Sequence, residues 1–274
     1  GGWRGIKEFT VVKIREESED VRSIWFGPKD GGVPPEFSPG QYITVCENPT
    51  KEDWCAPRHY TISSDTELRV SVKKIGVMSS YLHSLPVGAA VKLRPPFGTA
   101  THTSYFPQAS GPEQGLWQLV QMLKLSQAVA DSPLPPSPAH VFIAGGIGIT
   151  PIRALAAVSA AQGRRVLVVH ASGGAGPPAL KEEMEAIVQL NPRSEYLTGN
   201  RSVVSEQSLR DLVAAHQLDA SQTHVHLCGP LPMTEAVLAS LAAIGWAQAC
   251  IHVDFFGPKG AAAPMPPCTG ACRS

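Results

Sequence analysis

A glycine-rich turn follows the apolar run that begins at His140, and a helical pattern begins directly after it. The turn reads Ala144-Gly145-Gly146-Ile147-Gly148-Ile149-Thr150-Pro151. Glycines allow a ligand to approach the backbone closely, and the free N–H groups at a helix N-terminus suit a phosphate. Pro151 fits the first turn of a helix, where its missing N–H costs nothing. Because the spacing departs from GxGxxG, a tight turn that needs glycine for packing stays open beside the predicted phosphate-binding loop.

A second turn, Cys228-Gly229-Pro230, ends a later apolar segment and also precedes a helical pattern. The carboxyl ends of parallel strands lie at one edge of a sheet, and ligands bind outside that edge. We therefore expect the two turns at the same edge of one sheet. A thiol at the end of a buried strand is more often a small apolar group than a reactive one, which is the alternative for Cys228.

Three motifs before residue 100 also combine groups that could bind a ligand. Arg58-His59-Tyr60-Thr61 joins a cation, an aromatic ring and a hydroxyl, which together could hold a flat polar ring and a phosphate. The alternative is a strand with one exposed arginine and a half-buried tyrosine. Phe37–Tyr42 could be only a turn into a strand, and Gly76–Ser80 only a capped helix start.

Histidines and cysteines show no metal-binding pattern. Core or strand-edge positions are expected for His83, His170, His224, His226 and His252, since no pair has convincing helical ligand spacing. The six cysteines show no repeated CxxC, so neither a zinc site nor a disulfide framework is predicted.

The elements that must position these motifs change in kind along the chain. Short β-rich segments separated by Gly, Pro, Asn and Asp predict an antiparallel barrel with one short helix, Ser79–Ser84. The predicted strands are Phe9–Arg15, Val21–Phe26, Gln41–Cys46, His59–Ser63, Leu68–Lys74 and Ala90–Leu93. From residue 140, strands alternate with helices, which predicts a doubly wound parallel sheet.

Four regions follow from these patterns. They are a β-barrel (1–102), an inserted amphipathic helix with a Pro-rich linker (103–139), an α/β domain (140–258) and a disordered tail (259–274). The insertion is expected to form a lid or docking helix outside the core, because it combines an apolar stripe with DSPLPPSP.

Composition excludes several classes of protein. The 274 residues hold 23 Lys and Arg against 23 Asp and Glu, a balance that argues against a nucleic-acid binder. The longest apolar stretch, Val141–Ala161, contains glycines, a proline and an arginine, so it is a poor membrane span. No signal peptide opens the chain. We expect a cytoplasmic protein without membrane partners that is a piece of a longer polypeptide.

The motifs occur in the order PGQY, RxYT, GxMSxYLH, GGIGITP, CGP and FFGP. That order resembles the ferredoxin–NADP reductase-like superfamily. Within it, the reductase half of the flavohaemoglobins, which are nitric oxide dioxygenases, is most similar: Gly1–Gly5 looks like the junction after their globin domain, and IHVDFFGP is also shared. Cytochrome b5 reductases, which share RxYT and the Met-Ser pair, are the nearest rival.

The resemblance implies roles for individual residues. Tyr42 and the strand Arg58, His59, Tyr60 and Thr61 would bind FAD, with Thr61 standing where the family usually has Ser. Met78, Ser79 and Ser80 would offer backbone N–H groups to its pyrophosphate. Gly146, Ile147, Gly148, Ile149, Thr150 and Pro151 would cradle the nicotinamide cofactor, with Cys228, Gly229 and Pro230 beside the nicotinamide. Phe255, Phe256, Gly257 and Pro258 would lie at the flavin, Phe256 covering the isoalloxazine ring. The residues expected to act in the reaction itself are Thr150, Cys228, Asp254 and Phe256, Asp254 replacing a family glutamate.

The implied activity is hydride transfer from NADH to FAD, followed by passage of single electrons to the haem of a globin domain, where nitric oxide becomes nitrate. Haem itself is not expected in this chain, because no segment resembles a haem-ligating helix. The inserted segment and the absence of an aromatic residue after Gly98 depart from the family pattern. Two alternatives remain: a stand-alone FAD reductase of the cytochrome b5 reductase type that serves another one-electron acceptor, and a non-enzymatic interaction module.

The turn His170–Gly176 bears on the choice of nicotinamide cofactor. It offers Ser172, but Gly173 stands where NADP-preferring relatives have an arginine. It also lacks the acidic residue that marks an NAD-specific site. NADH is therefore expected to be preferred over NADPH without absolute discrimination.

Overall fold

The computed structural model describes residues 5–47, 57–98, 139–174 and 176–255, and every statement on structure below concerns these ranges. The predicted insertion helix, the predicted tail and Phe256–Pro258 lie outside them. Among the described helices, none is both long and apolar enough to cross a bilayer.

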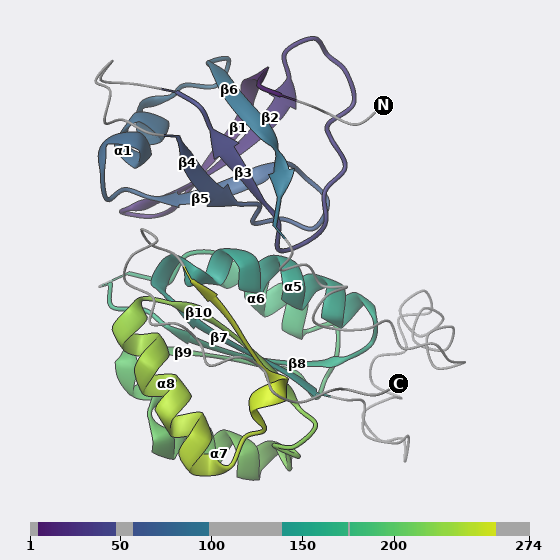
Figure 1. The fold of residues 1–274 in the computed structure, drawn as a ribbon, viewed down its shortest axis with the longest axis vertical. Coiled ribbons are helices and arrows are strands. Elements are labelled where there is room, and N and C mark those ends of the chain that lie inside the picture. The colour runs from purple at the N-terminus through teal and green to yellow at the C-terminus, as the bar shows by residue number, and fades with distance from the viewer. Residues whose placement is uncertain (1–4, 48–56, 99–138, 175, 256–274) are drawn as a thin grey trace.

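The first domain is an antiparallel sheet that curls on itself (Figure 1). Its strands follow the order β4-β3-β6-β1-β2-β5, and an isolated bridge between Ile62 and Val70 brings the two ends of that order together. The predicted antiparallel barrel is confirmed. Its elements are β1 (Lys7–Ser18), β2 (Val21–Pro28), β3 (Tyr42–Val45), β4 (Arg58–Thr61), β5 (Arg69–Lys73), α1 (Val77–Ser84) and β6 (Ala90–Phe97).

Strand β6 continues beyond the predicted end at Leu93, although Pro95 and Pro96 follow. Its pairing with β1 spans Ala90 to Leu93, whereas its pairing with β3 continues to Phe97. A proline cannot donate to a strand ladder, so it is tolerated where the strand has a neighbour on one side only. The prolines therefore mark the place where β6 leaves β1, not the end of the strand.

The second domain is a parallel sheet with the strand order β11-β10-β7-β8-β9, as the strand–helix alternation predicts. Its strands are β7 (Ala139–Gly145), β8 (Arg165–Ala171), β9 (Glu195–Gly199), β10 (His224–Gly229) and β11 (Ile251–Phe255). Its helices are α5 (Ile149–Ala161), α6 (Lys181–Val188), α7 (Glu206–His216) and α8 (Leu231–Ile244), with short 3₁₀ turns η1 (Gly146–Gly148), η2 (Arg201–Val204) and η3 (Gln248–Cys250).

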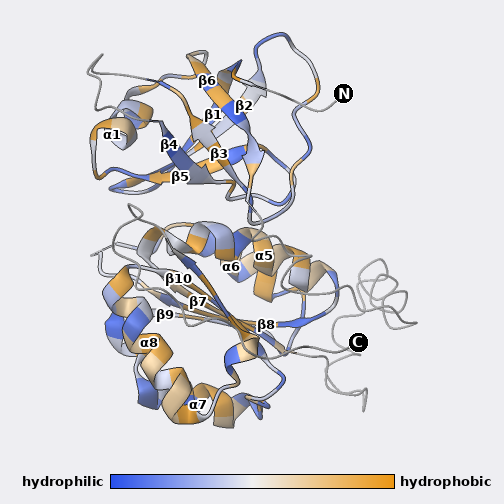
Figure 2. Ribbon diagram, viewed as in Figure 1, coloured by the Kyte–Doolittle hydropathy of each residue, from blue (hydrophilic) through white to orange (hydrophobic). Residues whose placement is uncertain are grey.

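Two hydrophobic cores enclose this sheet. Helices α5 and α6 cover the face that looks toward the barrel, and α7 and α8 cover the other face (Figure 1). The strands are apolar along most of their length, as expected for a sheet buried on both faces (Figure 2). Helix α5 is buried almost all round because it lies between the sheet and the barrel. Its first turn is therefore held between the two domains.

Candidate cofactor-binding site

The two glycine-containing turns lie on neighbouring strands. Strands β8 and β9 follow on one side of β7, while β10 and β11 lie on its other side. The sheet thus reverses its order between β7 and β10, and at such a switch point a crevice opens outside the carboxyl ends of the strands. A Cβ atom on Gly148 would stand 2.2 Å from the carbonyl oxygen of Cys228, and one on Gly229 would stand 3.1 Å from Cα of Gly145. The two turns are in direct contact, at the edge where the sequence places them.

The glycines of the first turn have different roles. Gly145 and Gly148 lack space for any side chain, since added Cβ atoms would fall 2.6 Å from Sδ of Met233 and 2.2 Å from the Cys228 carbonyl oxygen, respectively. Gly146 has a φ of +51°, and nothing lies within 4 Å of its Cβ position. The packing interpretation therefore holds for Gly145 and Gly148. Gly146 presents open backbone at the carboxyl end of β7, as close approach of a ligand requires.

The remaining residues of the turn stabilise its conformation through burial and one internal hydrogen bond. Ile149, Thr150 and Pro151 are buried, and Thr150 Oγ1 donates a hydrogen bond of 3.1 Å to the carbonyl oxygen of Ile147. Gly146 and Ile147 are partly exposed. Because α5 begins at Ile149, the positive end of its dipole lies at this turn and favours an anionic group. The N–H of Ile149 itself already donates within the turn, to the carbonyl oxygens of Gly146 and Ile147.

His170 forms a hydrogen bond with the backbone of Gly146. Its Nε2 lies 3.0 Å from the carbonyl oxygen of Gly146 and its Nδ1 lies 2.9 Å from the hydroxyl of Tyr196. Since a carbonyl can only accept, Nε2 carries the proton and Nδ1 accepts from the tyrosine. Burial lowers the pKa of His170 to about 4, so the ring is neutral at pH 7. The sequence places His170 in the core correctly, but its link to Gly146 depends on pairing between β7 and β8.

Cys228 is an enclosed thiol in the core of the second domain. Burial raises its pKa well above the ordinary value, and the nearby carboxylate of Asp254, its register partner on β11, adds to this effect. The thiol therefore stays protonated. Pro230, the next residue but one, is exposed just after the end of β10. Whether Cys228, Asp254 and Thr150 act in the reaction stays a prediction.

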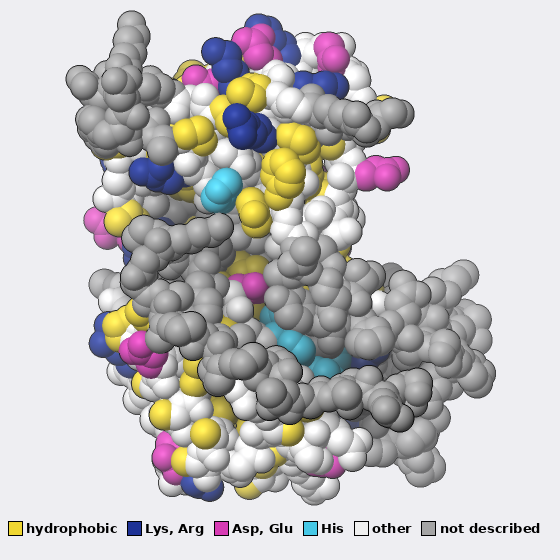
Figure 3. Space-filling model, in the orientation of Figure 1, with side chains coloured by type: hydrophobic (Ala, Val, Ile, Leu, Met, Phe, Trp, Pro, Cys, Tyr) yellow, Lys and Arg dark blue, Asp and Glu magenta, His cyan; other side chains and the backbone are white. Residues whose placement is uncertain are grey.

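Histidines of β10 and β11 form a stacked row on the second domain. The rings of His224 and His252 lie 5.2 Å apart with planes inclined by 10°, and His224 Nδ1 is 2.9 Å from His252 Nε2. His226 is fully buried beside them. Figure 3 shows histidine side chains gathered on this domain below the barrel. His224, His226 and His252 therefore occupy core or strand positions, as expected from the sequence.

In the barrel, the RHYT segment forms β4 and pairs with β3, with Tyr42 opposite Thr61. Side chains alternate along a strand, so His59 and Thr61 share one face with Tyr42, while Arg58 and Tyr60 lie on the other. The rings of Tyr42 and His59 are 4.9 Å apart, inclined by 56°. Tyr60 packs against the barrel core, and burial raises its pKa to about 12. The motif thus contributes to two faces instead of one.

Helix α1 begins at the predicted GVMSS motif. The hydroxyl of Ser79 accepts from the N–H groups of Ile75 and Gly76, both at 2.9 Å, and so closes the helix start. The N–H of Ser80 already donates to the carbonyl oxygen of Gly76 at 2.8 Å. The N–H groups of Met78 and Ser79 precede this first intrahelical bond, so they are the ones that suit a phosphate.

Comparison with known proteins identifies both domains. The model of the oxidoreductase FAD-binding domain matches residues 8–102, and the model of the oxidoreductase NAD-binding domain matches residues 142–239. Together they match more than half of the chain. The chain thus contains an oxidoreductase FAD-binding domain followed by an oxidoreductase NAD-binding domain.

Relatives of this oxidoreductase include flavohemoproteins. That of Bordetella pertussis is 29% identical over 96% of this chain, which spans 63% of the relative's length. The flavohem-like FAD/NAD-binding domain of nitric oxide dioxygenase from Vibrio cholerae is 26% identical with a TM-score of 0.68, covering 92% of this chain and 99% of that one. Flavohemoglobin from Malassezia yamatoensis, solved with FAD and heme, is 23% identical with a TM-score of 0.69, covering 92% of this chain and 60% of that one.

The residues of the oxidoreductase fit the two cofactors its domains imply. The open backbone at Gly146 and the N-terminus of α5 suit a dinucleotide phosphate, and the start of α1 suits another. The rings of Tyr42 and His59, inclined by 56°, add aromatic surface on β3 and β4 of the barrel. The two sets belong to separate domains, which are in contact where β5 of the barrel meets η1.

We expect Arg58→Ala to weaken FAD retention about tenfold to a hundredfold. Arg58 is exposed at the start of β4, and a charge-assisted hydrogen bond to a phosphate is worth about 1.5–3 kcal/mol. The measurement is the dissociation constant for FAD, with Lys29→Ala, an exposed cation elsewhere in the barrel, as control. Equal affinity in both variants would remove Arg58 from the flavin site.

Proposed function

We propose that this oxidoreductase is the reductase part of a flavohaemoglobin-type nitric oxide dioxygenase. In this proposal it takes a hydride from NADH onto FAD and delivers single electrons to the haem of a globin domain. The observation that carries it is the likeness to the V. cholerae domain, which this chain matches over nearly the whole of that domain's length. The domain order, FAD-binding before NAD-binding, agrees with the proposal.

The chain's own residues would bind and orient the two cofactors. The nicotinamide cofactor and FAD supply the hydride and electron chemistry when bound. Gly146 would let the dinucleotide lie against the backbone, while Gly145 and Gly148 keep the two turns of the crevice in contact. Neutral His170 fixes the Gly146 carbonyl, and the protonated Cys228 thiol adds no charge beside the ring. Orientation of two rings is the main requirement of hydride transfer, so an acid–base pair is not needed.

An anaerobic titration of the purified protein tests the proposal. The protein should show a flavin spectrum, NADH should bleach it, and a ferric globin added afterwards should be reduced. A protein that binds FAD but is not bleached by NADH would refute the proposed hydride transfer. Reduction of cytochrome b5 with no reduction of any globin would instead favour the stand-alone reductase.

Cofactor preference gives a second measurement. We expect kcat/KM with ferricyanide to favour NADH over NADPH by about tenfold, or ~1.4 kcal/mol. The turn after β8 offers no basic side chain: Ser172 is half-buried, and Gly173 and Gly174 have nothing within 4 Å of their Cβ positions. A preference for NADPH would contradict the expectation and direct attention to Arg201, which opens η2 beside β8.

A further inference from the structure

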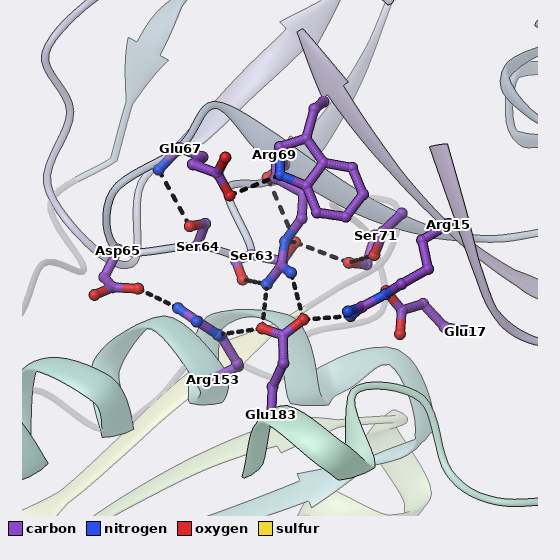
Figure 4. A network of polar contacts seen from close by, with 12 residues as sticks. Arg15, Glu17, Ser63, Ser64, Asp65, Glu67, Arg69, Ser71, Arg153 and Glu183 are labelled. Carbon is purple, nitrogen blue, oxygen red and sulfur yellow. Dashed lines mark hydrogen bonds and ion pairs between the residues drawn. The ribbon is translucent and has the colours of Figure 1, made fainter. Parts of the chain in front are cut away.

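One carboxylate of the second domain is held by three arginines (Figure 4). Glu183, in the first turn of α6, accepts from Arg69 at 2.6 Å and 3.0 Å, one bond to each carboxylate oxygen. It also accepts from Arg153 Nε at 2.7 Å and from Arg15. Arg15 and Arg69 come from β1 and β5 of the barrel, whereas Arg153 comes from α5. Glu183 thus links the two domains.

The cluster around Glu183 joins the segments that flank the two cofactor sites. Arg153 lies in α5 just after the GGIGITP turn, and its guanidinium also binds Asp65. Asp65 follows Ser63, which lies two residues beyond the end of β4, and Ser63 Oγ accepts from Arg69 Nε at 3.1 Å. A continuous chain of hydrogen bonds therefore runs from Ser63, just after β4, through Arg69 and Glu183 to Arg153 on α5.

The charges of this cluster are satisfied and largely withdrawn from water. The side chain of Arg69 is 3% exposed, that of Arg153 16% and that of Glu183 17%. The three arginines are matched by Glu183, Asp65 and Glu17, and Arg69 also lies over the ring of Trp25 at 5.2 Å. Despite burial, the arginines lower the pKa of Glu183 to about 2, so it is ionised at neutral pH.

Buried ion clusters are weak contributors to stability, since desolvation offsets much of their attraction, but they can fix one geometry among several. An apolar contact between domains tolerates sliding, whereas a forked arginine–carboxylate pair has one preferred arrangement. The use of charged groups at this interface therefore points to a need to fix the orientation of the two domains, and less to a need to stabilise their contact.

We propose that Glu183 is a positioning residue that sets the distance between the flavin and nicotinamide sites. The inference rests on the proposed hydride transfer from NADH to FAD. Reacting atoms in such a transfer must lie about 3–3.5 Å apart, and a displacement of about 1 Å can cost a hundredfold in rate. Glu183 is not among the residues assigned to either cofactor site. It acts through its hydrogen bonds to Arg153 on α5 and to Arg69 on β5.

The test compares Glu183→Gln with Glu182→Gln in the full chain. Glu182 lies in the same helical turn and is exposed, so its variant makes the same change in charge outside the cluster. For each protein we would measure bound FAD, the dissociation constant for NADH, and the anaerobic rate constant of flavin reduction at saturating NADH. NADH deuterated at the transferred position reports whether hydride transfer limits that rate.

Glu183→Gln is expected to retain FAD and to bind NADH within about threefold of the unmodified protein, while reducing its flavin about tenfold to a hundredfold more slowly with a full isotope effect. Glu182→Gln should behave as the unmodified protein. An unchanged reduction rate in Glu183→Gln, or a rate that falls only in proportion to lost FAD, would overturn the proposal.

If Glu183→Gln fails to accumulate, Glu183→Asp makes the same comparison, because it keeps the charge but withdraws the carboxylate by one methylene. Slowed reduction at full FAD content supports the proposal, and the unmodified rate overturns it. Failure of the proposed function is distinguishable, since the unmodified protein with bound FAD would then not be reduced by NADH at all.

Discussion

Gly148→Ala is expected to destabilise the second domain by more than about 3 kcal/mol and to abolish reduction by NADH. Gly148 has a φ of −58°, which any residue adopts, so the need for glycine comes from space alone. The added methyl group would lie 2.2 Å from the carbonyl oxygen and 2.7 Å from the carbonyl carbon of Cys228. Both atoms are backbone at the end of a central strand, so no side-chain rotation can relieve the contact.

Urea denaturation monitored by circular dichroism gives the unfolding free energy for this variant. Gly173→Ala is the matched control, because nothing lies within 4 Å of its Cβ position and its φ is not in the left-handed region. The control should be within about 0.5 kcal/mol of the unmodified protein. A Gly148→Ala protein as stable as the control would show that the two turns are not in contact in solution.

Lowering the pH from 6.5 to about 4 is expected to cost the protein about 3 kcal/mol of stability through His170 alone. Its pKa is lowered from 6.5 to about 4 by burial, and the ring is 1% exposed. Between these two values the unfolded chain binds a proton that the folded protein excludes, so stability rises with pH across the interval and is independent of this group above it. A tenfold difference in proton affinity between the folded and unfolded states corresponds to about 1.4 kcal/mol.

Unfolding free energies between pH 4 and pH 7.5 test this expectation. His170→Gln, which cannot titrate but can still donate to Gly146, should remove the larger part of the slope. Some slope should remain because burial also lowers the pKa of His252 to about 4. A slope unaffected by His170→Gln would mean that the ring is solvated in the folded protein.

The parts of the site predicted from sequence are those encoded by adjacent residues. GGIGITP and CGP each carry a strand end, a turn and a helix start in one short segment, so their common edge follows once the strand–helix alternation is recognised. Strand ends that depend on pairing were less predictable. Strand β6 pairs with β1 only as far as Leu93 but continues beside β3 to Phe97, and no local pattern shows this.

The sequence did not predict contacts between residues that lie far apart along the chain. Glu183 is separated from Arg69 by 114 positions and from Arg15 by 168, and each looks like an ordinary surface charge in its own segment. The one available signal was Arg153, a charged residue in a helix that is otherwise almost entirely apolar. The support of Gly146 by His170 was missed for the same reason, because only the pairing of β7 and β8 brings them together.

The shared carboxylate of Glu183 also limits how this protein can be recombined. Its barrel supplies the buried Arg69, while the second domain supplies Glu183, the acid that neutralises it. A chimera that joined this barrel to a dinucleotide domain without an acid at the start of α6 would bury a guanidinium with no counterion. The two domains are therefore matched to each other, and a working fusion has to keep Arg69 and Asp65 of the barrel together with Arg153 of α5 and Glu183 of α6.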